Sequence, residues 1–242
     1  MVEAGLWGAV GASSLLIGAI LGLALRIPRG AIGLILGFGA GTLISALAFE
    51  LTEEAFDVGG ADAVAIGLAA GALAYFVGDE TIERRGAANR MSSMGEQSGG
   101  SANALLLGAV LDGIPESAVI GITLLEGGTV GIAVLAAVFL SNLPESISSS
   151  TGMRMAGSSR SHVVRVWSVV VLVSAASAAL AFALCDGASG NLIGLIQAFA
   201  GGAVLTMLVD TMIPEAYKHA GRAVGLVTVL GFALAYLLST LE

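Results

Sequence analysis

The sequence contains two apolar stretches that carry the same short motif, Pro-Glu-Ser. In the first, Glu116 follows Asp112 by four residues, and in the second, Glu145 follows Ser141 by four. Side chains four residues apart lie on one face of a helix. An aspartate at the centre of a bilayer costs about 2.5–3.5 kcal/mol on insertion scales, so such groups usually face a bundle interior, water or an ion. The two motifs therefore indicate a polar site between two membrane helices.

The proline in each motif adds a further type of oxygen. A proline inside a helix has no N–H and clashes with the carbonyl four residues earlier, which frees or tilts the carbonyls of Leu111 and Leu140. Asn142 supplies an amide oxygen, and Gly113 allows a neighbouring helix to approach Asp112 closely. If the two helices face each other, carboxylate, amide, hydroxyl and carbonyl oxygens surround one small volume.

Three carboxylates in one small volume cannot all ionise without compensation. Either some of them hold protons, or a divalent cation neutralises them. Both alternatives indicate ion movement across the membrane. We predict a metal site with the following oxygen ligands: Asp112, Glu116, Ser141, Asn142 and Glu145. Acidic residues near the ends of two other apolar segments are candidate pathway residues: Glu50, Asp210 and Glu215.

The composition is typical of a chain that lies in lipid. Hydrophobic residues make up 56% and charged residues 12% of the chain, and the mean hydropathy is +0.94. The 35 glycines, together with abundant Ala and Ser, allow close helix packing in lipid. The single cysteine, Cys185, excludes a disulfide within the chain and a CxxC zinc module. The net charge of −8 and the lack of clustered basic residues disfavour nucleic-acid binding.

Eight apolar segments are long enough to cross a membrane, at about 20 residues per crossing. We therefore expect an all-α, polytopic membrane protein with one transmembrane domain, residues 1–242. The predicted spans are about 4–26, 30–52, 60–79, 102–125, 128–150, 163–185, 191–214 and 222–240. The first lacks a basic leading region and a cleavage site, so we expect it to be retained. The polar residues 80–101 predict a solvated cytoplasmic loop without a metal-binding role.

The charges in the connections predict how the chain is oriented in the membrane. All 10 Lys and Arg residues fall in alternate connections between the predicted spans. The other connections, 57–62, 126–128 and 186–191, contain no basic residue. Basic loops remain in the cytoplasm, so both termini are predicted to lie outside it, in a cell membrane.

The ends of the second and seventh spans are similar in sequence. Glu50 precedes the pair Glu54-Ala55, and Asp210 precedes Glu215-Ala216. The two segments lie at opposite predicted membrane faces. This pattern is typical of an inverted repeat that relates spans 1–3 to spans 6–8 and leaves spans 4 and 5 between them, an arrangement of 3+2+3 helices.

The motif pair resembles the fourth- and fifth-span signatures of the ZIP (Zrt/Irt-like) divalent-metal transporters, whose helices carry His-Asn-x-Pro-Glu-Gly motifs. Eight spans, external termini, a long loop between spans 3 and 4 and the 3+2+3 repeat are also similar to that family. Ile213-Pro214-Glu215-Ala216 resembles its prokaryotic branch. The resemblance implies a transporter and not an enzyme, without a cofactor. It implies that zinc or a related metal moves toward the cytoplasm, by alternating access or a channel-like route.

The chain departs from the family pattern at the histidine positions. Asp112-Gly113 stands where the family has His-Asn, and Ser141-Asn142 stands where it has His or Gln followed by Asn or Asp. Glu116 and Glu145 match the usual ligand types directly, as does Asn142. An all-oxygen set suits Mg, Ca or Mn better than Zn. Zinc is the substrate that the resemblance implies, with Mn, Fe, Cd, Co or Mg as alternatives.

Two other functions are compatible with these residues. A ZIP-fold protein with altered histidine positions could carry another solute or serve as a sensor. An intramembrane aspartyl protease could use Asp112 and Asp210, although the Gly-x-Gly-Asp signature is absent and only Gly78-Asp79 offers a fragment of it. The small-residue surfaces also permit a homodimer.

Overall fold

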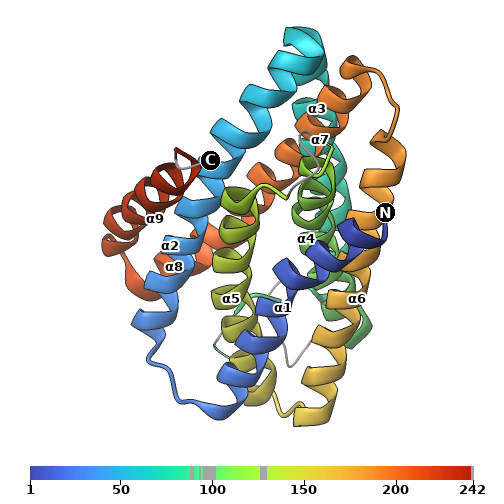
Figure 1. Cartoon of the computed structure of the whole chain (residues 1–242). Helices are drawn as coiled ribbons and strands as arrows, with labels where there is room; N and C mark the ends of the chain where they lie inside the picture. Colours follow the sequence, from blue (N-terminus) through green and yellow to red (C-terminus); the bar gives the residue numbers. More distant parts are fainter. Residues whose placement is uncertain (88–89, 93, 95–101, 126–129, 241–242) are drawn as a thin grey trace.

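The computed structural model describes residues 1–87, 90–92, 94, 102–125 and 130–240. These residues are almost all helical and contain no strand, which confirms the all-α prediction. Helices are the expected form in lipid, because each backbone polar group must find its partner within its own segment. The elements shown in Figure 1 are α1 (Val2–Ala24), α2 (Arg29–Ala46), the π-helical turn η1 (Leu47–Thr52), α3 (Glu53–Ile82), the π-helical turn η2 (Glu83–Ala87), α4 (Ala102–Thr123), α5 (Ile132–Met155), α6 (Arg160–Cys185), α7 (Gly190–Met207), the π-helical turn η4 (Leu208–Met212), α8 (Ile213–Ala220) and α9 (Ala223–Ser239).

Six helical segments in the described ranges are long and apolar enough to cross a membrane, and α9 is a shorter apolar helix. The chain is therefore a multi-pass membrane protein. One of the six segments, Arg29–Gly86, has 58 residues, which at 1.5 Å per residue is about 87 Å of helix, well beyond one bilayer. Its helical geometry is interrupted at Gly60, where φ is 75° and ψ is 177°. Figure 1 shows that the chain runs in one direction along α2 and the start of α3 and returns in the opposite direction along the rest of α3.

The helices pack through glycines, as expected where burial of apolar surface provides no drive for association. α2 packs along α9, and α3 packs along α7. A Cβ added to Gly41 of α2 would lie only 2.0 Å from the Thr228 carbonyl oxygen of α9. A Cβ added to Gly202 of α7 would lie 2.1 Å from the Leu68 carbonyl oxygen of α3. Neither contact can accommodate a larger residue.

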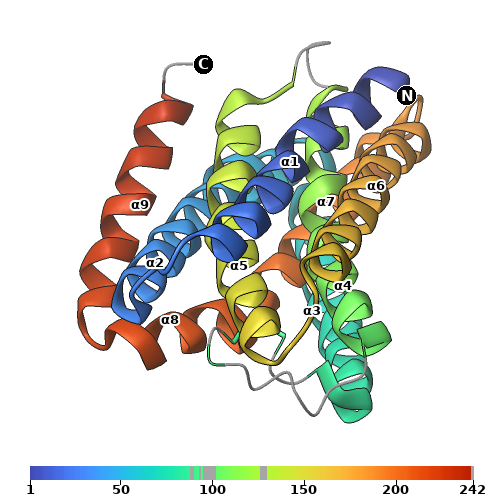
Figure 2. The same cartoon turned by 90° about the horizontal axis from the view of Figure 1, so that it is seen from below.

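The two helices with the proline motifs lie inside the bundle. α5 packs against α1 and α2, whereas α4 packs against α6, α1 and α7. Figures 1 and 2 both place α5 between α2 on one side and α4 on the other. Most of α5 from Ser141 to Met153 is buried, although this segment is rich in serine. The polar residues of the motifs are thus directed away from the lipid.

The connection between α3 and α4 differs from its prediction. Helical structure continues through α3 and η2 to Ala87. Arg90, Met91 and Ser92 are only 3%, 4% and 2% exposed. The prediction of a solvated linker is therefore wrong for these three residues, which insert among the helices. Residues 88–89, 93 and 95–101 of the predicted loop lie outside the described residues.

Candidate cation site

α4 and α5 bury all five of the predicted metal ligands. The exposed fractions are 1% for Asp112, 1% for Glu116, 0% for Ser141, 2% for Asn142 and 4% for Glu145. Glu145 lies within the electrostatic range of both Asp112 and Glu116, so the three carboxylates occupy one neighbourhood. Within the described part of the chain, no three His, Cys, Asp or Glu side chains are close enough together to hold one metal ion by themselves.

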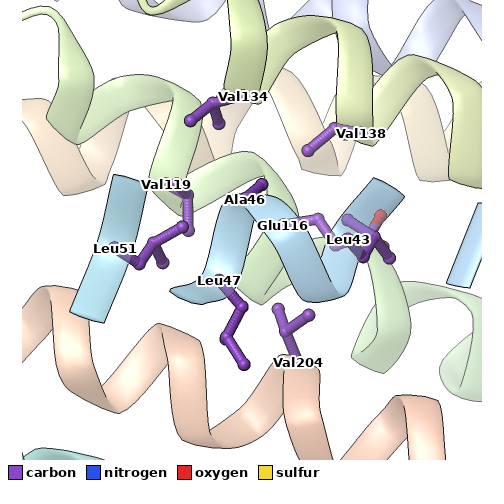
Figure 3. Close-up of a pocket in the computed structure, with 9 residues that line it drawn as sticks. All are labelled: Leu43, Ala46, Leu47, Leu51, Glu116, Val119, Val134, Val138 and Val204. Carbon is purple, nitrogen blue, oxygen red and sulfur yellow. The ribbon is translucent and has the colours of Figure 1, made fainter. Parts of the chain in front are cut away.

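Glu116 lies in apolar surroundings without a partner for its charge. Neither of its carboxylate oxygens has a hydrogen-bonding partner among the described residues. The side chain faces a cavity of about 20 Å³, and Figure 3 shows that the other lining residues are all apolar: Leu43, Ala46, Leu47, Leu51, Val119, Val134, Val138 and Val204. The nearby Ser141 hydroxyl donates its hydrogen to the Val138 carbonyl oxygen at 3.0 Å. Because an unpaired buried carboxylate is costly, Glu116 requires a proton or a cation.

Asn142 presents a third acceptor atom of this kind. Its amide oxygen is buried and has no hydrogen-bonding partner within the described ranges. Buried polar atoms are nearly always paired, so acceptors that lack a donor point to a missing positive group. Carboxylate and amide oxygens are the ligands that hard divalent cations prefer. The oxygen ligands that Glu116 and Asn142 offer therefore fit a cation.

Two backbone features of the motifs can also be located. The Leu140 carbonyl oxygen faces α2, where a Cβ added to Gly39 would lie 3.3 Å from it. At Gly113, an added Cβ would lie 3.1 Å from the Ser174 hydroxyl of α6. The prediction that Gly113 admits a close neighbour is thus confirmed, and the neighbour is α6.

Asp112 is engaged differently from the other two carboxylates. The Arg90 guanidinium donates from Nε to Oδ2 of Asp112 at 2.8 Å and from Nη2 to Oδ1 at 3.0 Å. The Tyr75 hydroxyl also donates to Oδ1. The same Nη2 of Arg90 lies 2.6 Å from Oδ1 of Asp79 and donates to the Tyr75 hydroxyl at 2.9 Å. Burial alone would lower the pKa of Arg90, but the adjacent Asp112 carboxylate and its hydrogen bonds raise it, so the guanidinium stays charged.

Sequence reasoning did not identify Arg90, Tyr75 or Asp79. One sequence feature could have indicated that Tyr75 and Asp79 act together, because they are four residues apart and hence share a face of α3. A second was that a buried Asp112 requires a positive partner. Neither signal selects Arg90 among the 10 basic residues, since that choice depends on how the connection folds back.

Two of the three predicted pathway residues line a second cavity. This cavity of about 160 Å³ is polar and adjoins basic connections; its lining residues are Glu83, Arg90, Met91, Ser92, Asp210, Thr211, Pro214, Glu215 and Lys218. Glu215 is held by His219, with 2.7 Å between Oε1 and Nε2. The third residue, Glu50, is half-buried in η1 and lines neither of the two cavities.

Comparison with known proteins gives one similarity that bears on these residues. The chain is 25% identical over 191 residues to a protein of Arabidopsis thaliana that bears the provisional name of a zinc transporter. The alignment covers 78% of this chain but only 30% of the relative, so the chain spans less than a third of that protein's length. No family model matches the chain. The similarity fits the resemblance of the motif pair to the ZIP transporters.

The geometry does not favour an aspartyl dyad. Asp112 is buried and its carboxylate is bound by Arg90. Asp210 is exposed and lines the polar cavity, which Arg90 borders as well. A catalytic pair requires two acids that share a proton at close range, and Asp112 is already paired with a guanidinium.

Proposed function

We propose that the protein is a divalent-cation transporter of the ZIP type, with its transport site between α4 and α5. The observation that carries this proposal is the set of buried acceptors at Glu116 and Asn142, which have no donor in the described structure. The similarity to a protein named as a zinc transporter supports a metal ion as the substrate. The apolar helices support a site inside a membrane protein, where a cation needs buried polar ligands to cross.

We further propose eight spans in a 3+2+3 inverted repeat. In support, the π-helical turns η1 and η4 follow α2 and α7, the second helix of each proposed repeat. The tight glycine contacts also come as a pair: Gly41 of α2 meets α9, and Gly202 of α7 meets α3. In each contact the second helix of one repeat packs on the third span of the other. The count of eight follows if the bend at Gly60 separates two spans and α9 forms the last one.

The proposed direction of transport is toward the face with the basic connections, which is the cytoplasmic face if both termini lie outside. On the opposite side of Glu116, the small cavity is lined by apolar residues of α2, η1, α4, α5 and α7. On the basic side, the cavity of about 160 Å³ is lined by Asp210 and Glu215. A cation released in that direction meets charged and polar groups, whereas the cavity on the other side of Glu116 offers it an otherwise apolar lining.

The ligands proposed for the transported cation are Glu116, Glu145, Asn142 and Ser141. Asp112 becomes available as a ligand only after Arg90 leaves it. All of these groups bind through oxygen, which favours harder cations such as Mn²⁺ or Mg²⁺ over Zn²⁺. Zinc stays a candidate because the relative is named for it. Fe²⁺, Co²⁺ and Cd²⁺ complete the set of cations to be tested.

The proposal is tested by uptake into proteoliposomes with Zn²⁺, Cd²⁺, Mn²⁺, Fe²⁺, Co²⁺ and Mg²⁺. The wild type is compared with Glu116→Gln and Glu145→Gln, which keep the side-chain size and remove the charge. Glu3→Gln, at an exposed position near the start of α1, is the matched control. We expect at least one cation to enter, and both site variants to reduce its uptake at least about tenfold, because each loses a charged ligand. Folded wild-type protein that takes up none of the six cations would overturn the proposal and favour another solute or a sensor.

A further inference from the structure

Arg90 forms the centre of a buried charge cluster that the proposed transport site does not explain. Its side chain is 3% exposed and lies between α3 and α4. Asp79 and Tyr75 approach it from α3, and Asp112 approaches it from α4. Glu145 of α5 and Glu83 of η2 lie within its electrostatic range. A single guanidinium therefore compensates the acidic side chains of several elements.

The backbone next to Arg90 is fixed from the side of α5. The Ser148 hydroxyl donates a hydrogen bond of 2.6 Å to the Met91 carbonyl oxygen. Met91 is 4% exposed and belongs to the main hydrophobic core of the bundle. Ser148 comes three residues after Glu145, so this anchor lies within one turn of the proposed site. The guanidinium is thus held between the two motif helices and α3.

Arg90 also forms part of the wall of the polar cavity of about 160 Å³. One side of the residue contacts Asp112, a predicted ligand, and the other borders the cavity that contains Asp210 and Glu215. The guanidinium therefore lies between Asp112 and this cavity. Arg90 is therefore in a position to compete with the cation for the same oxygens.

We propose that Arg90 competes with the transported cation for Asp112. The Arg90 guanidinium stays bound to the Asp112 carboxylate until a divalent cation displaces it. This inference rests on the proposed function. The physical reason is that a buried carboxylate cannot be left unpaired, so Asp112 exchanges one positive partner for another. The guanidinium binds Asp112 through two hydrogen bonds, and an incoming ion has to supply more charge at closer range than these. Arg90 thereby sets the affinity for the cargo and disfavours monovalent cations.

The alternative is that Arg90 is a fixed brace that only holds α3 to α4. The two ideas predict opposite effects for Arg90→Gln. Removal of a competitor lowers the KM for uptake, since the apparent affinity of a site is reduced by the fraction of molecules in which it is available. For a minor state populated at about 0.1–10%, the KM should fall at least about tenfold. Loss of a brace leaves the KM unchanged or raises it.

The test measures uptake of Mn²⁺ and Zn²⁺ into proteoliposomes, together with the rise in melting temperature that each cation causes. Arg84→Gln is the matched control, because Arg84 lies in η2, which follows α3, and forms an exposed pair with Glu80 at 2.7 Å. We expect it to keep the wild-type KM. The double variant Arg90→Gln/Asp112→Asn should lose the gain in affinity of Arg90→Gln, because the contested carboxylate is gone.

If Arg90→Gln does not fold, the KM for uptake is measured with Arg90→Lys instead. An ammonium keeps the charge but cannot form the two-pronged contact with Asp112, so it competes less well and the KM should fall severalfold. A wild type that transports, with Arg90→Lys or Arg90→Gln at or above the wild-type KM, overturns the inference and leaves the proposed function intact. Absence of both uptake and cation-dependent melting shifts in all folded variants would instead overturn the proposed function.

Discussion

The Ser148 hydroxyl and the Met91 carbonyl oxygen, 57 residues apart in the sequence, are joined by a hydrogen bond of 2.6 Å. This contact links the C-terminal half of α5 to the connection that precedes α4. Because Arg90 is adjacent to Met91, the bond also fixes where the guanidinium meets Asp112. The position of the charge that binds Asp112 thus depends on a serine in the buried, serine-rich part of α5.

Ser148→Ala should destabilise the protein by about 1–3 kcal/mol, the cost of a buried carbonyl without its donor. Thermal unfolding in detergent measures the change. Ser168→Ala is the control, since among the described residues the Ser168 hydroxyl donates to the Val164 carbonyl of its own helix, at 2.8 Å. Equal stability of the two variants would show that the Met91 contact does not contribute to the fold.

The paired glycine contacts predict matched effects in the two halves of the chain. Gly41→Ala and Gly202→Ala each place a methyl group about 2 Å from a backbone oxygen, at 2.0 Å and 2.1 Å. Overpacking of this kind costs about 1–3 kcal/mol or more, and both variants should melt at a similarly reduced temperature. Gly225→Ala is the control, because an added Cβ at Gly225 meets no atom of the described residues within 4 Å.

A tolerated Gly41→Ala or Gly202→Ala would contradict the close approach of α2 to α9 or of α7 to α3. A large loss in only one of the two variants would contradict the proposed equivalence of the halves. Gly225→Ala should be neutral or slightly stabilising, since alanine is the better helix former by about 1 kcal/mol.

Much of the fold follows from local sequence patterns. Long apolar runs rich in glycine and alanine can satisfy their backbone only as helices, which accounts for the correct all-α prediction. The burial of Asp112, Glu116 and Glu145 was likewise predictable, since carboxylates within a membrane helix avoid lipid. The span count of eight and the 3+2+3 arrangement stay predictions.

Other parts of the site could not be derived from the sequence. Composition assigns residues 80–101 to a polar linker, yet Arg90 and Met91 are buried because Asp112 and Ser148 offer them partners. Those partners are distant in the sequence, and no local sequence pattern predicts them. The metal roles of Asp112, Glu116, Ser141, Asn142 and Glu145 stay predictions for the same reason, since ligation depends on distances between helices.

The proposed topology predicts which exposed positions are reached from each side of the membrane. With Cys185 replaced by alanine, single cysteines are introduced at four exposed residues: Asp57, Thr81, Ser161 and Ser189. A membrane-impermeant maleimide added to whole cells should label the cysteines at 57 and 189 and leave those at 81 and 161 unlabelled until the cells are opened. Labelling of the 81 and 189 positions from the same side would contradict the eight-span alternation.

The most direct test of the central claim is the number of Mn²⁺ ions bound per chain, measured by electron paramagnetic resonance on purified protein in detergent. We predict that the wild type binds Mn²⁺ and that Zn²⁺ displaces the Mn²⁺ from this site. Glu116→Gln and Glu145→Gln should each weaken this binding at least about tenfold, because each removes one of the few buried charges that can hold the ion. Glu3→Gln should bind as the wild type does. Wild-type binding by the Glu116→Gln and Glu145→Gln variants would contradict the claim that the cation site lies between α4 and α5.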